Sequence, residues 1–281
     1  MFNFFKIVFR ALSIERGLLK VLIKALNIYK NHGLVGLRQG FLYFLCNGRI
    51  KPIDGSGKFD RNDYSEWIHR YDFLSNQKLR AMKSKLDGMN EFPLISIVMP
   101  TYNSNINWLK QAIDSVKAQI YPHWELCIAD DASTNNYIHK FLKEAANKDK
   151  RIKLKIRNKN GHISRASNSA IKLAQGQWIA LLDHDDLISE DALFLVAKTI
   201  IENNSAALIY SDEDKIDENN IRSGPYFKPD WNYELFLSQN LITHLGVYRK
   251  DIVDKIGGFR EGFEGAQDYD LALRFIDCIN P

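Results

Sequence analysis

From residue 94 onward the sequence alternates between short apolar runs and longer amphipathic segments, and this alternation limits the possible fold more than any other feature of the chain. The apolar runs are typical of buried strands, and the segments between them have the spacing of helices. We predict strands at 94–100, 124–131, 151–157, 178–183 and 206–213, and helices at 105–119, 135–149, 164–175 and 190–203. Such βαβ units form a doubly wound, mostly parallel α/β sheet with helices on both faces. After about residue 220 the alternation stops, and we expect short strands in irregular chain.

The N-terminal part of the chain differs from this domain in charge. Residues 1–51 contain nine Lys or Arg and one acid, so their net charge is +8, whereas the whole chain carries +4. We interpret 1–50 as a basic amphipathic helical segment and 51–92 as a turn-rich linker followed by one polar helix at 64–86. The main domain then covers 93–281. Because the positive charge is confined to one end, a nucleic-acid partner is not expected.

Residues 1–45 have two interpretations. A cationic helix with Phe and Leu on its other face can lie on an anionic membrane surface, and the alternative is a helix packed on the body of the protein or on a partner. No uncharged run reaches the roughly 18–20 residues that span a bilayer, and no signal-peptide cleavage pattern follows the first lysine. The three scattered cysteines, Cys46, Cys127 and Cys278, favour a reducing compartment. The expected location is the cytoplasm, with peripheral contact at the inner face of the cell membrane.

Carboxylates follow three of the predicted strands, where an open α/β sheet binds its ligands. Asp183 and Asp185 form a compact pair directly after the apolar run WIALL. Two hard oxygen ligands at a strand end suit Mg²⁺ or Mn²⁺, ions that take further ligands from water and a substrate phosphate. The alternative is helix capping, since Asp186 or Ser189 could cap a helix that begins near Glu190. An EF-hand is excluded because neither of the acidic loops DHDDLI and DEDKID, which begin at Asp183 and Asp212, has glycine at loop position six.

The ends of the first two predicted strands indicate a site for a nucleotide base. Asp130 and Asp131 end the second strand, and a carboxylate there can accept the N3–H of a uracil or thymine ring. Tyr102, after the first strand, can stack on the base. The alternatives are a turn with a helix cap for the aspartates and a core position for the tyrosine. The combination at consecutive strand ends favours the base site.

Six ordered segments resemble family-2 glycosyltransferases of the GT-A fold. They cover about 94–275, roughly two thirds of the chain, and read ISIVMPTYN, WELCIADDAS, NGHISRASNSAIKLAQGQWIALLDHDD, IYSDEDKID, YFKPDWNYELFLSQNLITHLGVYRKDIVDKIGGF and EGAQDYDLALR. The later segments resemble most the branch that builds bacterial surface polysaccharides. This resemblance implies a GT-A domain in 93–281.

The resemblance also implies roles for individual residues. The nucleotide-sugar would be held by Pro100, Thr101, Tyr102, Asp130, Asp131 and Asp183. A divalent ion, Mg²⁺ or Mn²⁺, would be bound by Asp185 with Asp183. His244 falls near the diphosphate or the metal, and its alternative is an ordinary strand histidine.

Asp268 falls on the catalytic base of the family. An inverting transfer needs a base that takes the proton from the acceptor hydroxyl as it attacks the anomeric carbon. The charge on the leaving diphosphate would be neutralised by the metal on Asp185. The alternative is an acidic first turn of a helix, where Asp268 or Asp270 is favourable near the helix dipole.

The expected function is transfer of a hexose or deoxyhexose from a nucleotide-diphosphate donor to a glycan or lipid-linked acceptor, in cell-surface polysaccharide synthesis. Two departures from the family pattern are Gln267, where a glutamate is usual, and the end of the chain at Pro281. Family members usually continue with a helix, a strand and a basic loop that closes over the diphosphate, so we expect an incomplete C-terminal end. The alternative function is therefore a non-catalytic nucleotide-sugar-binding or interaction protein.

Overall fold

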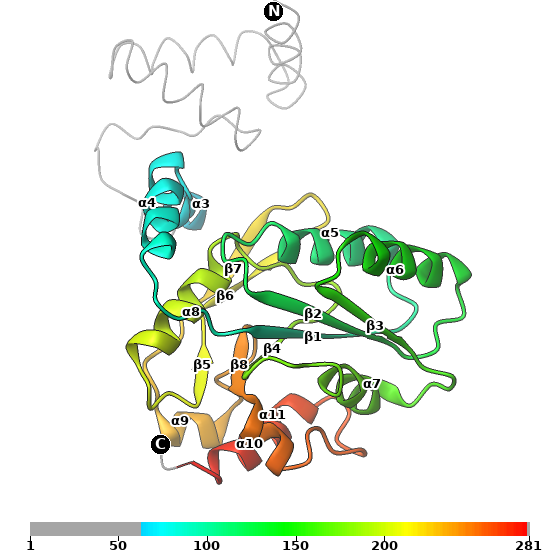
Figure 1. The fold of residues 1–281 in the computed structure, drawn as a ribbon. Helices are drawn as coiled ribbons and strands as arrows, with labels where there is room; N and C mark the ends of the chain where they lie inside the picture. The colour runs from blue at the N-terminus through cyan, green and yellow to red at the C-terminus, as the bar shows by residue number, and fades with distance from the viewer. Residues whose placement is uncertain (1–62, 280–281) are drawn as a thin grey trace, which may run out of the picture. The chain divides into compact units, whose positions relative to one another are not determined.

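The computed structural model describes residues 63–279, and within 67–279 the chain forms a six-stranded sheet (Figure 1). The strands lie in the order β3 (Ile152–Ile156), β2 (Trp124–Asp130), β1 (Ile95–Thr101), β4 (Trp178–Leu181), β8 (Gly246–Arg249) and β5 (Leu208–Tyr210). The first four strands in this order are parallel, and β8 is antiparallel to both of its neighbours. β5 therefore runs in the same direction as β4. The predicted α/β class and mostly parallel sheet are confirmed.

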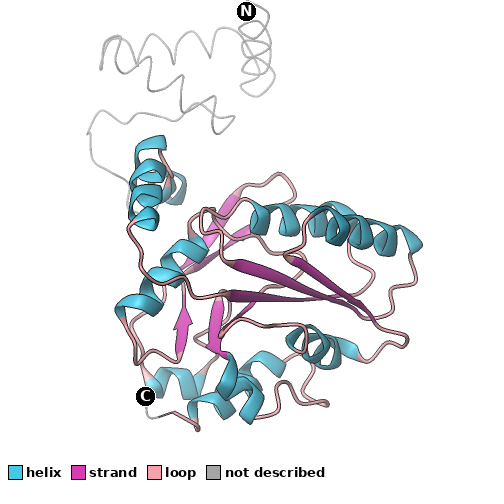
Figure 2. Ribbon diagram, viewed as in Figure 1, coloured by secondary structure: helices cyan, strands magenta, loops and turns pink. Residues whose placement is uncertain are grey.

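Helices cover both faces of this sheet (Figures 1 and 2). One face is covered by α5 (Ile106–Lys117), α6 (Asn136–Lys148) and α8 (Ala192–Glu202). The other is covered by α7 (His162–Ile171), α9 (Tyr233–Ser238), α10 (Lys250–Lys255) and α11 (Gln267–Ile276). The two faces have separate hydrophobic cores, as expected for a doubly wound sheet.

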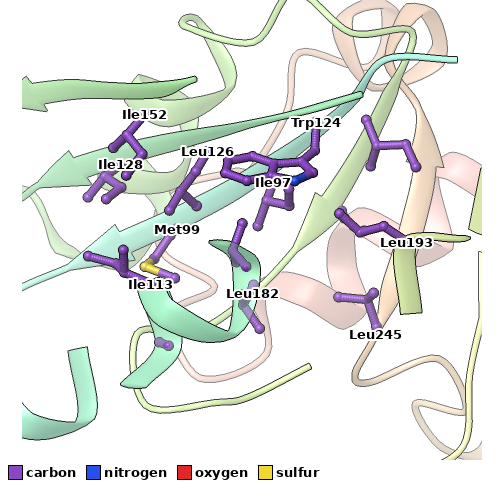
Figure 3. Close-up of a cluster of buried hydrophobic side chains, with 14 of the residues drawn as sticks. Ile97, Met99, Ile113, Trp124, Leu126, Ile128, Ile152, Leu182, Leu193 and Leu245 are labelled. Atoms are coloured by element: carbon purple, nitrogen blue, oxygen red, sulfur yellow. The ribbon is translucent and has the colours of Figure 1, made fainter. Parts of the chain in front are cut away.

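The central strand β1 shows why the predicted strand segments are mainly apolar. All seven of its residues are buried. Ile97 and Met99 enter the core on the α5 side, which Figure 3 shows, while Val98 enters the core on the α7 side. A strand with helices on both faces has no solvent side, so its sequence is mainly apolar, and the hydroxyls of Ser96 and Thr101 are hydrogen-bonded within the protein.

Asparagine side chains cap the N-termini of α5 and α6, the helices that follow β1 and β2. The Asn105 side chain accepts a hydrogen bond from the backbone N–H of Asn107 at 2.9 Å, and Asn135 accepts one from Tyr137 at 2.9 Å. Each bond satisfies an amide of the first helical turn that has no partner within the helix. α5 and α6 therefore begin soon after the strands end, which keeps the loops at the strand ends short.

The predicted single helix at 64–86 is wrong. The chain forms α3 (Tyr64–Trp67), a π-helical turn η1 (Ile68–Asp72) and α4 (Asn76–Asp87). Phe73 is extended, and the Ser75 hydroxyl accepts a hydrogen bond from the Lys78 N–H at 3.2 Å. Ser75 therefore starts a new helix where the apolar spacing alone indicated continuity.

The predicted strand at 206–213 also differs, because β5 ends at Tyr210. The following residues form a separate hairpin of β6 (Glu213–Ile216) and β7 (Arg222–Tyr226). Among residues 63–279, no helix combines the length and the apolar character needed to cross a membrane. The predicted basic segment 1–50 and the start of the linker lie outside the described residues.

Candidate functional site

The loops that carry the predicted site meet at one edge of the sheet. β1, β2, β4 and β5 run in the same direction, so the loops that follow them start from the same edge. β8 runs the other way, and its first residue, Gly246, pairs with Tyr210 at the end of β5. The loop before β8 therefore reaches this edge as well, and it carries the histidine of the predicted metal site.

Two carboxylates and this histidine form a compact group. The ligand atoms of Asp183, Asp186 and His244 all lie within 4.8 Å of one another. His244 Nε2 is 3.8 Å from Asp183 Oδ2 and 3.5 Å from Asp186 Oδ2. Within residues 63–279, His244 is the only basic side chain at ion-pair distance from either carboxylate.

The charge of this group is poorly compensated. Burial raises the pKa of Asp183 and of Asp186; His244 opposes the shift, and neighbouring carboxylates add to it. A divalent cation would offset this repulsion. Two carboxylate oxygens and an imidazole nitrogen are ligands that Mn²⁺ accepts, and Mg²⁺ would rely mainly on the oxygens.

A turn decides which aspartates come together. The Asp186 N–H donates to the Asp183 carbonyl at 3.2 Å, so the chain folds back over four residues. Asp186 thereby joins Asp183 in the group, whereas Asp185 is exposed and is not a member. The role of Asp185 stays a prediction. The capping alternative for Asp186 and Ser189 is wrong, because α8 begins at Ala192 with Asp191 at the cap position.

Buried leucines lie next to Asp183 and His244 in the sequence and hold these two segments in place. Leu182 precedes Asp183 and is 2% exposed, and Leu245 follows His244 and is 8% exposed. Both leucines belong to the core on the α5 side and are labelled in Figure 3. The polar residues beside them are therefore held at the surface of a packed core, which limits how far they can move.

Asp268 lies in the first turn of α11. Its Oδ2 accepts a hydrogen bond from Asn240 Nδ2 at 2.8 Å. The orientation of the Asn240 amide is set because its Oδ1 accepts from the N–H groups of Ile242 and Thr243, at 3.1 and 3.4 Å. Oδ1 of Asp268 has no hydrogen-bond partner among the described residues. The Asp268 charge is also one of those that raise the pKa of Asp183, after burial and the Asp185 charge.

Asp270, two residues further on, has a different environment. It is 7% exposed and accepts hydrogen bonds from Arg260 Nε at 3.1 Å and Arg274 Nε at 2.9 Å. Arg274 also donates to the carbonyls of Ile256 and Gly258. Asp270 therefore ties α11 to the loop after α10. Both aspartates lie in the acidic first turn, but only Asp268 keeps a carboxylate oxygen without a partner in the described chain.

The residues predicted to hold the nucleotide-sugar at the ends of β1 and β2 lie at the same edge of the sheet. Pro100 is inside β1, where it pairs with Ala129, and Thr101 is 2% exposed with its hydroxyl bonded to that of Ser104 at 2.8 Å. Tyr102 is 46% exposed, so the core alternative for this ring is wrong. Of the five residues at the ends of β1 and β2 that are predicted to hold the nucleotide-sugar, Tyr102 alone has an exposed side chain.

Asp130 and Asp131 are bonded within the protein. Asp130 is fully buried and accepts from the hydroxyl and N–H of Ser133, at 2.6 and 2.9 Å. His139 Nε2 lies 3.0 Å from the same carboxylate. Asp131 is 2% exposed, accepts from the Gly161 N–H at 3.0 Å, and pairs with Arg157 Nε at 2.7 Å. The turn interpretation holds for Asp130, while contact of either aspartate with a base stays a prediction.

Three polar residues near His244 were missed by the sequence reasoning: Glu213, Lys228 and Asn240. Burial lowers the pKa of the Lys228 ammonium against the opposing effect of Glu213. Burial raises the pKa of Glu213, but hydrogen bonds from Thr243 and His244 and the Lys228 charge outweigh it and lower the pKa overall. No spacing in the sequence marks these residues, because their burial depends on contacts between distant segments.

Comparison with known proteins identifies the family to which the chain belongs. The family model described as Glycosyl transferase family 2 matches residues 96–257, more than half of the chain. The O-antigen biosynthesis protein RfbC of Myxococcus xanthus is 34% identical over 218 residues, which are 78% of this chain and 17% of that protein. The chain spans about a fifth of the length of this relative and of several others.

Two solved structures share the fold. TarS 1-349 of S. aureus in complex with UDP-GlcNAc has a TM-score of 0.54 and 23% identity, covering 64% of this chain and 52% of that one. The mannosyltransferase PcManGT of Pyrobaculum calidifontis in complex with GDP-Man and Mn²⁺ has a TM-score of 0.50 and 18% identity, covering 71% and 58%. At these identities the likeness establishes the architecture of the sheet and its helices.

Proposed function

The chain belongs to glycosyl transferase family 2, and on that basis we propose that it moves a sugar from a nucleoside-diphosphate donor to a glycan or lipid-linked acceptor in cell-surface polysaccharide synthesis. The observation that carries the proposal is the group of Asp183, Asp186 and His244 at the ligand-binding edge of the sheet. The name of the RfbC relative supports the polysaccharide context. The nucleotide-sugars in the complexes of the two structural relatives support the class of donor.

We assign the donor diphosphate to the part of the site formed by Asp183, Asp186 and His244, where a bound divalent cation would contact it. Asp183, Asp186 and His244 would hold a divalent ion, with Asp185 close enough along the chain to contribute. When bound, the ion neutralises the charge that develops on the leaving diphosphate. Tyr102 offers its exposed ring for stacking on the base.

Asp268 is the proposed catalytic base of an inverting transfer. Asn240 occupies one carboxylate oxygen, which leaves Oδ1 to accept the proton of the acceptor hydroxyl. The acceptor oxygen then forms a bond to the anomeric carbon while the bond to the diphosphate breaks. A fixed carboxylate orientation matters because the base has to reach a single proton in the transition state.

Metal-dependent donor binding tests the proposal. We expect Mn²⁺ to tighten the binding of UDP or GDP to the chain, measured by calorimetry and by thermal stabilisation. Asp183→Ala should remove the Mn²⁺-dependent part of the affinity, because it deletes a ligand shared by both assignments of the ion. Asp191→Ala is the matched control, since this nearby aspartate makes no side-chain cap bond to α8.

A second comparison tests whether Asp186 or Asp185 binds the ion together with Asp183. Unchanged Mn²⁺ dependence in Asp183→Ala would contradict the site altogether. If Asp186→Ala removes the dependence and Asp185→Ala does not, the ion is held by the group seen in the structure. The reverse result would support Asp185, as the family resemblance implies.

Membrane contact through residues 1–45 is a further part of the proposal, and these residues lie outside those the structure describes. Their positive charge and their Phe and Leu residues favour a peripheral site on an anionic surface at the cytoplasmic face. We expect the full chain to float with phosphatidylserine liposomes at low salt and to be released at high salt. Equal flotation after deletion of 1–45 would contradict this role.

A further inference from the structure

Lys228 is buried beneath the loop that carries His244. Its side chain is 1% exposed. The ammonium group donates to the carbonyl oxygens of Ile242 and His244, both at 2.7 Å, and to Glu213 Oε2 at 3.3 Å. A lysine ammonium has three hydrogens, so these three acceptors use all of them. A fully buried lysine is rare, and here every bond it makes goes to this loop or to the carboxylate beside it.

Glu213 accepts hydrogen bonds from donor groups of the same loop. Its Oε2 accepts from the Thr243 hydroxyl at 2.7 Å and from the His244 N–H at 2.9 Å. Lys228 and Glu213 together therefore bind both the N–H and the carbonyl of His244. An ion pair in this place fixes one main-chain conformation, which a pair of apolar side chains would not do.

The backbone of the loop needs such support. Thr243 has φ of +38°, a left-handed conformation that is costly for a β-branched residue. The surrounding contacts have to outweigh that cost. Strained residues of this kind persist where the structure requires a particular side-chain position, and the next side chain is the imidazole that faces Asp183 and Asp186.

We propose that Lys228 and Glu213 are positioning residues, which hold the main chain of residues 242–244 so that the His244 imidazole faces Asp183 and Asp186. The inference rests on the proposed function, because it assigns the purpose of this arrangement to cation binding. Neither side chain needs to touch the ion. Residues that orient a metal ligand in this way commonly change metal affinity by roughly 10–100-fold when they are removed.

The test measures Mn²⁺ itself. Titrations followed by electron paramagnetic resonance of free Mn²⁺ should show that Lys228→Met weakens Mn²⁺ binding by about tenfold. Methionine keeps the length of the side chain and removes its donors. Lys215→Met, an exposed lysine on β6, should bind Mn²⁺ as the parent does.

A double-mutant cycle separates positioning from general destabilisation. If Lys228 acts through His244, Lys228→Met should have little further effect on Mn²⁺ affinity in a protein that already carries His244→Ala. A merely structural lysine would lower the melting temperature and leave Mn²⁺ affinity unchanged in the folded fraction. If Lys228→Met does not fold, Glu213→Gln, which keeps the shape of the side chain, is judged by the same criterion.

The outcomes are distinguishable. No Mn²⁺ binding by the parent chain would contradict the metal site of the proposed function. Binding by the parent, lost in His244→Ala but retained by folded Lys228→Met and Glu213→Gln, would overturn the positioning role and leave the metal site in place.

Discussion

Asp268→Asn should lower the rate of sugar transfer by roughly 10²–10⁴ and leave donor affinity within a few-fold of the parent. Asparagine keeps the shape of the side chain and removes its basicity. The expected split arises because a base acts on the proton of the acceptor and makes little contact with the donor. Hydrolysis of the donor serves as the assay while the acceptor is unknown, since water then takes the place of the acceptor hydroxyl.

Asp270→Asn is the matched control for Asp268→Asn. Both residues lie in the first turn of α11, but Asp270 is bonded to Arg260 and Arg274. We expect Asp270→Asn to lower the free energy of unfolding and to keep the turnover number of the folded enzyme. Loss of donor binding with an unchanged turnover number in Asp268→Asn would show that Asp268 is a donor ligand or a helix cap, and that the base lies elsewhere.

The fold was largely predictable because a parallel sheet leaves a strong sequence signal. β1 and β2 are buried on both faces, so each appears as a mainly apolar run between helical segments. The place of β8 was not predictable. Nothing in the residues 246–249 shows that this strand enters between β4 and β5 in the opposite direction, since that pairing depends on long-range contacts.

The site was predictable only in part for the same reason. Asp183 follows a strand end, and this position is visible in the sequence. The choice of Asp186 as its partner depends on a turn hydrogen bond, and the proximity of His244 depends on the reversed direction of β8. For Asp131, the sequence shows a carboxylate at a strand end but not the Arg157 and Gly161 contacts that engage it.

Glu125→Ala should lower the free energy of unfolding at pH 7 by about 3–5 kcal/mol, the usual effect of removing one partner from a buried ionic network. Glu125 is 4% exposed. Its Oε1 accepts from the Ser96 hydroxyl at 2.6 Å and from the Gln175 N–H at 2.5 Å. Its Oε2 is paired with the Lys153 ammonium. The single side chain thus connects β1, β2, β3 and the turn that leads into β4, and urea denaturation measures its contribution.

The turn held by Glu125 has little freedom to adjust. A Cβ on Gly176 would lie 2.4 Å from the Leu94 carbonyl oxygen, so the turn before β4 packs directly against the chain before β1. Removal of the carboxylate leaves buried N–H groups without acceptors in a segment that cannot easily move toward water. Asp114→Ala is the control, because this α5 aspartate is 53% exposed and its pair with Lys117 should contribute less than about 1 kcal/mol.

The stability difference between the parent and Glu125→Ala should also depend on pH. Burial raises the pKa of Glu125, but bonds from Lys153, Ser96 and Gln175 outweigh it, so the folded-state pKa lies below the ordinary value of 4.5. A carboxylate whose pKa is lowered by folding stabilises the protein fully above its unfolded-state pKa, and this contribution is lost as the pH falls through the folded-state value. The difference should therefore be constant from about pH 7 to 5 and shrink below 4.5. A difference that stays constant into the acid range would show that Glu125 stabilises the sheet by packing, without a contribution from its charge.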